Sequence, residues 1–150
     1  MKKLSAALVG AIGVLGGCSM LEGVNNSLSY VNEATEYANE ASSFAQEAPS
    51  LAEQAVQDPD AAGELETKLE EMKADIEEFN ELDAPSVAED LHQQVVSQND
   101  KALEGIQVYL DNVENGTLDP SVIENTELFQ TMSELSQIVD QIEEIQQLGE

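Results

Sequence analysis

Residues 32–52 read NEATEYA NEASSFA QEAPSLA, three consecutive heptads that decide how this chain folds. In each heptad an alanine takes one seam position and a larger residue follows three positions later, so small and large residues alternate along one stripe of a helix. The small members are Ala34, Ala41 and Ala48, and the large members are Tyr37, Phe44 and Leu51. This pattern predicts a helix with an alanine-rich face that a neighbouring helix can approach closely.

Pro49 interrupts the third heptad. Inside a helix, proline removes a backbone hydrogen bond and its ring clashes with the preceding turn, at a cost of about 3 kcal/mol. We therefore expect the first helix, residues 20–47, to break or kink at this point, and we interpret residues 49–57 as a short separate helical turn.

Three short motifs each place a carboxylate just before a proline: Asp58-Pro59, Asp83-Ala84-Pro85 and Asp119-Pro120. A carboxylate suits the N-cap of a helix and proline suits its first turn. The motifs predict helices over residues 59–82 and 85–114, then a short piece at 120–124 and a last helix over 125–148. Asn125 can cap that last helix, and Asn115-Gly116 supplies the stop of the third. No run alternates as a strand does.

Each of these helices carries an apolar stripe at helical spacing. The stripe of the second helix is Leu65, Leu69, Met72, Ile76 and Phe79. That of the third is Val87, Leu91, Val95, Ala102, Ile106, Tyr109 and Val113, and that of the fourth is Leu128, Met132, Leu135, Val139, Ile142 and Ile145. The polar run Gln98-Asn99-Asp100 interrupts the third stripe, which fits a buried amide, a kink or a thin patch in the core.

The fold class predicted from these patterns is all-α, an antiparallel up-down four-helix bundle. At 1.5 Å rise per residue the helices are roughly 35 to 45 Å long, so they can lie side by side. Short connections make sequence neighbours antiparallel. We expect the bundle to be a monomer.

The N-terminal residues indicate export and a lipid anchor. Two lysines precede a twelve-residue apolar stretch, Leu4 to Leu15, which is too short to span a bilayer and suits a signal peptide. Leu15, Gly16, Gly17 and Cys18 match a bacterial lipobox, in which the cysteine carries the lipid. We therefore expect residues 1–17 to be a signal peptide, and residues 18–150 to be an acidic bundle held on the outer face of the cell membrane through Cys18.

The charge of the chain excludes one class of partner. The sequence has 31 acidic residues against five lysines and no arginine, for a net charge of −26. Binding to nucleic acid through a basic patch is therefore excluded, because phosphate contacts need Lys or Arg. Beyond the membrane, the expected partner is another envelope protein with a basic surface, although the acidity also fits a simple role in solubility.

Few residues could carry chemistry. Glu89 and His92 have the E-x-x-H spacing of di-iron bundles, but a second such motif cannot exist because His92 is the only histidine. We interpret His92 as a surface residue and Cys18, the only cysteine, as an acylation site. No catalytic residue, cofactor or metal site is predicted. A bundle that binds a metal or a small molecule through Glu89 and His92 is the alternative.

Several stretches resemble a family of short, uncharacterised lipoproteins of Gram-positive spore-forming bacteria: the lipobox at 15–18, YVNEATEY at 30–37, APSLAE at 48–53 and NGTLDP at 115–120. The resemblance covers nearly the whole chain. It implies an envelope location and no assigned activity. The function we predict is a non-enzymatic envelope lipoprotein that serves as a helical binding or spacer module.

Overall fold

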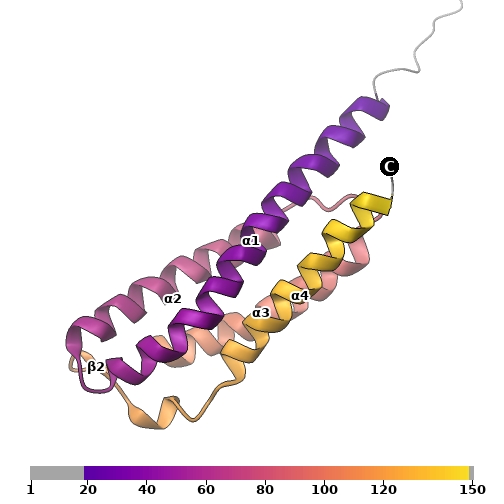
Figure 1. Ribbon diagram of the computed structural model, residues 1–150. Helices are drawn as coiled ribbons and strands as arrows, with labels where there is room; N and C mark the ends of the chain where they lie inside the picture. Colours follow the sequence, from indigo (N-terminus) through magenta and orange to yellow (C-terminus); the bar gives the residue numbers. More distant parts are fainter. Residues whose placement is uncertain (1–18, 149–150) are drawn as a thin grey trace, which may run out of the picture.

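The computed structural model describes residues 19–148 and has four long helices (Figure 1). They are α1 (Ser19–Ala55), α2 (Pro59–Asn80), α3 (Glu89–Asp111) and α4 (Glu127–Leu148). Each helix packs on its neighbours in sequence, and α1 also packs on α4 to close the bundle. The prediction of an all-α, up-down four-helix bundle is confirmed. Within residues 19–148, no helix combines the length and the apolar content that a bilayer crossing requires.

Helix α1 does not end at Pro49, so the prediction of a break there is wrong. The helix runs without interruption to Ala55 with Pro49 inside it. The physical reason is burial on both sides of the proline: Phe44 and Ala48 precede it, Ala52 follows it, and all three lie in the core. A break would remove the last two turns of α1 from this core, so tertiary packing outweighs the local cost of the proline.

The alanine seam of α1 is internal. Ala34, Ala41 and Ala48 have no exposed surface, and Tyr37 and Phe44 are buried beside them. The ring of Tyr37 stacks on Phe79 of α2 with 4.6 Å between centroids, whereas Phe44 lies 6.1 Å from Phe129 of α4. The small and large residues of the repeat therefore fit α1 between its two neighbours.

Helix α2 begins as predicted and its whole apolar stripe is buried. Asp58 caps it, since the carboxylate accepts a hydrogen bond of 3.0 Å from the backbone N–H of Asp60, and Pro59 takes the first helical position. The helix ends at Asn80, two residues earlier than expected.

The third helix is shorter than predicted at both ends. It begins at Glu89, because Pro85 to Ala88 form a turn in which the Ala88 N–H donates to the Pro85 carbonyl at 2.8 Å. Val87 is therefore not on the inner face, as helical spacing had indicated, and 69% of its surface is exposed.

A small β-hairpin follows α3, so the prediction of a chain without strands is wrong at this point. Strands β1 (Val113–Glu114) and β2 (Thr117–Leu118) pair antiparallel across Asn115 and Gly116. Both turn residues have positive φ, 55° and 82°, as a two-residue hairpin of type I′ requires. The Asn-Gly pair is thus the loop of a hairpin and does not cap a helix.

The last helix has the predicted two-part start. A 3₁₀ turn, η1 (Pro120–Val122), is capped by Asp119, whose carboxylate accepts from the Ser121 N–H at 2.8 Å. Asn125 then accepts from the Glu127 N–H at 3.2 Å, which begins α4. The hydroxyl of Tyr109 donates to the Asn125 carbonyl at 3.0 Å and ties this connection to α3.

The polar run of α3 contains a buried amide, one of the three readings left open above. Asn99 is fully buried and hydrogen-bonded to side chains of both α1 and α2. Gln98 and Asp100 are more exposed. The stripe therefore continues through this point with a polar member in place of an apolar one.

The internal position of the alanine seam gives a stability prediction. Ala41→Leu should lower the free energy of unfolding by about 1 to 3 kcal/mol, because three extra carbons must enter a filled seam. Urea titration followed by circular dichroism measures the loss. Asn39→Leu, at an exposed position of the same helix, is the matched control and should change stability by less than about 0.5 kcal/mol. Equal stability of the two variants would contradict an internal seam.

Candidate functional site

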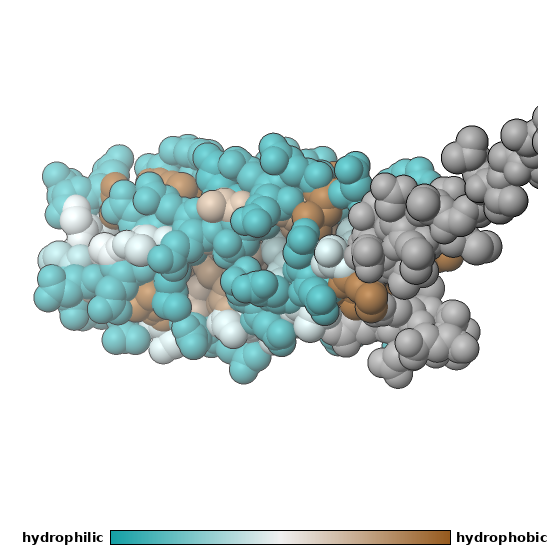
Figure 2. All heavy atoms as spheres, turned by 90° about the horizontal axis from the view of Figure 1, so that it is seen from above, coloured by the Kyte–Doolittle hydropathy of each residue, from teal (hydrophilic) through white to brown (hydrophobic). Residues whose placement is uncertain are grey.

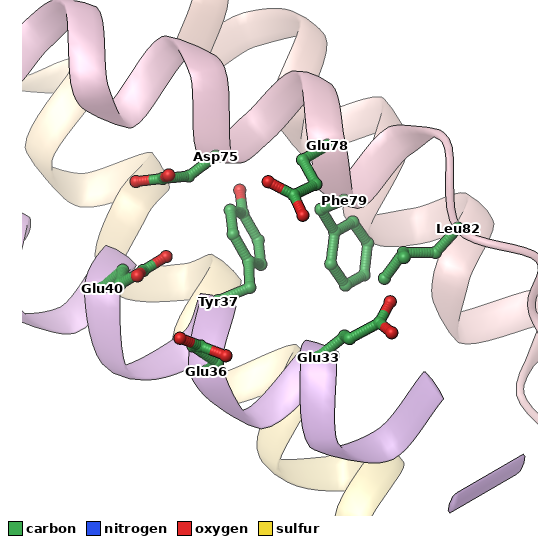
Figure 3. Close-up of a pocket in the computed structure, with 8 residues that line it drawn as sticks. All are labelled: Glu33, Glu36, Tyr37, Glu40, Asp75, Glu78, Phe79 and Leu82. Atoms are coloured by element: carbon green, nitrogen blue, oxygen red, sulfur yellow. The ribbon is translucent and has the colours of Figure 1, made fainter. Parts of the chain in front are cut away.

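A furrow lined by acidic side chains runs between α1 and α2 (Figure 3). It encloses about 130 Å³ and has two facing rows of carboxylates. Helix α1 supplies Glu33, Glu36 and Glu40, and α2 supplies Asp75 and Glu78. The floor between the rows is formed by Tyr37, Phe79 and Leu82.

Helical spacing explains why the rows face each other. On α1 the three glutamates are three and four residues apart, so they share one edge of the helix beside the buried stripe. Asp75 and Glu78 are likewise three residues apart on the edge of α2. Because the apolar stripes of α1 and α2 pack together, the polar edges next to them meet across the contact.

No basic residue lines this furrow within the described part of the chain. Burial raises the pKa of Asp75, and repulsion from Glu71, Glu78 and Glu36 raises it further. Burial also raises the pKa of Glu40, with added repulsion from Asp75, Glu36 and Glu78. The two helices therefore repel each other electrostatically at this edge while their apolar faces attract.

A lysine lines the neighbouring hollow along the same helix pair. Lys68 lines that hollow together with Glu71 and Asp75, and its ammonium group lies 2.7 Å from a carboxylate oxygen of Glu47 on α1. Both side chains are substantially exposed. This cross-helix ion pair is a surface pair of the kind that contributes about 1 kcal/mol or less.

The floor residue Tyr37 is turned toward the interior of the bundle. Its hydroxyl donates to the side-chain oxygen of Asn99 on α3, and the Asn99 amide donates to the side-chain oxygen of Asn80 at 2.7 Å. Burial raises the pKa of Tyr37 well above its usual range. The phenol thus stays neutral and holds α1, α2 and α3 together beneath the carboxylates.

His92 is not the surface residue that we predicted. It is half-buried, its Nδ1 lies 3.0 Å from the Tyr30 hydroxyl, and its ring stacks on Phe79 with 5.0 Å between centroids. Burial lowers the pKa of His92 and raises that of Tyr30 to about 12, so both groups are neutral near pH 7. His92 on α3 therefore packs against aromatic rings of both α1 and α2, those of Tyr30 and Phe79.

The E-x-x-H motif does not form a metal centre in this arrangement. Glu89 is exposed at the start of α3, while the Nδ1 atom of His92 is engaged with Tyr30. Among residues 19–148, no group of three or more histidine, cysteine, aspartate or glutamate side chains is placed to hold a metal ion.

The predicted lipid attachment site and lipobox, Cys18 with Leu15, Gly16 and Gly17, lie outside the described residues. The furrow, by contrast, is not predicted by the sequence patterns. A signal for it was present in the glutamates that flank the apolar stripe of α1, but their partners depend on which helix packs there.

Figure 2 shows that the visible face of the molecule is largely hydrophilic, with hydrophobic residues scattered over it.

The fold and the furrow define the class of this protein as an acidic four-helix bundle with a carboxylate-lined edge between α1 and α2. The chain belongs to a family of unknown function designated DUF6376, whose model matches residues 30–145. It is 33% identical over 145 residues to the uncharacterized lipoprotein YybP of Bacillus subtilis (strain 168). The alignment covers 95% of this chain and 98% of that relative. No solved structure matches the chain. The resemblance to a family of uncharacterised lipoproteins is thereby confirmed.

The buried link from Tyr37 to Asn99 can be tested by a double-mutant cycle. Asn99→Leu should destabilise the fold by about 1 to 3 kcal/mol, because it leaves the Tyr37 hydroxyl and the Asn80 amide without this partner. In the Tyr37→Phe background the same substitution should be less harmful, since one orphaned group is gone. Urea unfolding of the four proteins measures the coupling energy, and strictly additive losses would contradict a working hydrogen bond.

Proposed function

We propose that this protein is a non-enzymatic envelope lipoprotein whose bundle stands on the outer face of the membrane as a rigid acidic spacer and binding module. Support comes from the family, from the name of the relative as a lipoprotein, and from the lipobox that ends in Cys18. The proposal assigns the chain no catalytic step, in keeping with the structural roles of His92, Tyr37 and Asn99.

One observation carries the spacer role. Helix α1 begins at Ser19, the residue after the proposed lipid attachment site, and runs for 37 residues, of which those from Tyr30 onward contribute to the described core. A domain that moves freely on its anchor needs a flexible linker. Here the helix that starts one residue after the proposed anchor is about 55 Å long. The direction of α1 therefore sets the orientation of the whole bundle relative to the membrane.

In the upright orientation the two ends of the bundle would lie at different distances from the membrane. The contact of Tyr30 with His92 places the start of α3 about 17 Å along α1 from Ser19. The hairpin of β1 and β2 lies at the opposite end, beside Pro59 at the start of α2 (Figure 1). In the upright orientation the hairpin is the part farthest from the bilayer.

The charge of the module defines the partner that it would hold. Its long sides carry rows of carboxylates, so a second envelope protein would have to offer lysine or arginine to them. Repulsion between copies of net charge −26 favours a monomer. Anionic lipid is also repelled, which favours an upright bundle over one that lies flat.

Fluorescence resonance energy transfer from a dye on the protein to acceptor lipids in the membrane tests the upright orientation. In the lipidated protein Cys18 is blocked, so Glu114→Cys in the hairpin and Val87→Cys in the α2–α3 connection can each be labelled uniquely with a donor dye. Both positions can take a dye, because Val87 and Glu114 are exposed. In vesicles with acceptor lipids, transfer should be strong from position 87 and weak from 114.

A flexible insertion provides the control for this experiment. Six glycine and serine residues between Ser19 and Met20 should reduce the difference between the two positions, because they uncouple the anchor from α1. Equal transfer from both positions without the insertion would mean that the bundle lies flat, and the spacer role would be wrong.

Lipid attachment itself has a separate test. Cys18→Ala should leave an unprocessed precursor of higher mass, since the signal peptidase of lipoproteins acts only after the cysteine is acylated. Mass spectrometry of the membrane fraction distinguishes this from the mature form. Normal processing and release of the variant would contradict the lipoprotein assignment.

A further inference from the structure

The two rows of the furrow form a like-charge interface within the fold. Glu36 and Glu40 on α1 lie across from Asp75 and Glu78 on α2, and Figure 3 shows these carboxylates gathered around the rings of Tyr37 and Phe79. Repulsion acts across the helix contact, because Asp75 on α2 raises the pKa of Glu40 on α1, and Glu36 on α1 raises the pKa of Asp75. The apolar floor of the furrow holds the helices together against this repulsion.

We propose that the furrow is a charge-operated latch: protons or dissolved salt close the contact between α1 and the second half of α2, and full ionisation at low salt loosens it. The furrow suits this role better than ligand binding. Among residues 19–148 its carboxylates are not placed to coordinate one metal ion together. Protons and screening ions need no such geometry, since each acts on single groups or on the field between them.

The titratable groups that face the furrow come from two helices only. On α1 they are Glu33, Glu36, Tyr37 and Glu40, and on α2 they are Glu71, Asp75 and Glu78. A cation lies close to them: Lys68 lines the neighbouring hollow with Glu40, Glu71 and Asp75 and is paired with Glu47. Tyr37 remains neutral throughout, because burial raises the pKa of its phenol. No residue of α3 or α4 lines the furrow in the described chain, so the carboxylates control the latch.

The direction of the pH effect follows from the raised pKa values of Asp75 and Glu40. A carboxyl group whose pKa is higher in the closed state binds protons more tightly there than in the open state. Its contribution is fully present below the pKa of the open state and is lost as pH rises through the pKa of the closed state. The latch therefore tightens as pH falls from neutral toward the ordinary range of carboxyl groups. His92 acts in the opposite direction, since burial lowers its pKa, so protonating it favours the open state below its ordinary value.

Opening would have a local consequence. Tyr37 and Phe79, which stack with 4.6 Å between ring centroids, would separate first, because they lie directly beneath the carboxylates. Leu65 and Leu69, which line neither the furrow nor the neighbouring hollow, would stay packed. The latch thus loosens the half of α2 that leads into the connection at 81–88, at the end where α1 begins (Figure 1).

Hydrogen exchange on the full-length protein in a non-ionic detergent tests the latch. Amides of residues 72–80 should open about three- to fivefold more often at about pH 8 and low salt than at about pH 5, after correction for intrinsic exchange. About 0.5 M sodium chloride at pH 8 should restore most of the protection, because it screens the rows. Protection that is independent of both pH and salt would overturn the proposal.

Matched variants separate the latch from general relief of negative charge. Glu40→Gln with Asp75→Asn removes two facing carboxylates and should reduce the pH and salt effects on residues 72–80 to less than about twofold. Glu66→Gln with Glu70→Gln removes the same charge from exposed positions of α2 that do not line the furrow, and should leave both effects in place. Equal responses of the two pairs would show that overall charge, and not the furrow, controls opening.

Discussion

The structure depends on the burial of one face of α1. This helix packs extensively on both α2 and α4, and its seam alanines are fully buried. Small residues there allow close approach, while Tyr37 and Phe44 fill the space between the seams. Because this face continues past Pro49 to Ala55, it also holds a proline inside a helix, where local preference alone would end it.

A buried polar link complements this packing where α2 and α3 meet, the pair with the least extensive contact among sequence neighbours. The side-chain oxygen of Asn99 accepts a hydrogen bond from the Tyr37 hydroxyl, and its amide nitrogen donates to the side-chain oxygen of Asn80. One amide group on α3 therefore connects α1 and α2. An apolar residue could fill the same space in several registers, whereas hydrogen bonds are satisfied in one. In the same region His92 joins Tyr30 and Phe79, which extends the link toward the start of α1.

Sequence reasoning succeeded where local signals and tertiary structure agree. The stripe of α2 and the caps Asp58 and Asn125 are short-range features, and they predicted the number and order of the helices. It failed where packing or turn chemistry decides. Val87 lies in a turn and not in the helix that its spacing predicts, and the Asn-Gly pair forms a hairpin, for which it is a recognised signal, and not a helix end. The burial of His92 could not be predicted, because it depends on Tyr30, 62 residues away in the chain.

The two rows of carboxylates in the furrow could not be predicted from the sequence, because they depend on how α1 and α2 pack. Glutamates beside an apolar stripe are normally solvated, and on α1 alone they have no special meaning. They become an opposed row only when α2 packs so that Asp75 and Glu78 face them. The same helix therefore supplies the core seam and one row of charge. A change in the charge at this edge acts on the helix that packs on both α2 and α4, so the electrostatics of the furrow bear on the packing of the whole bundle.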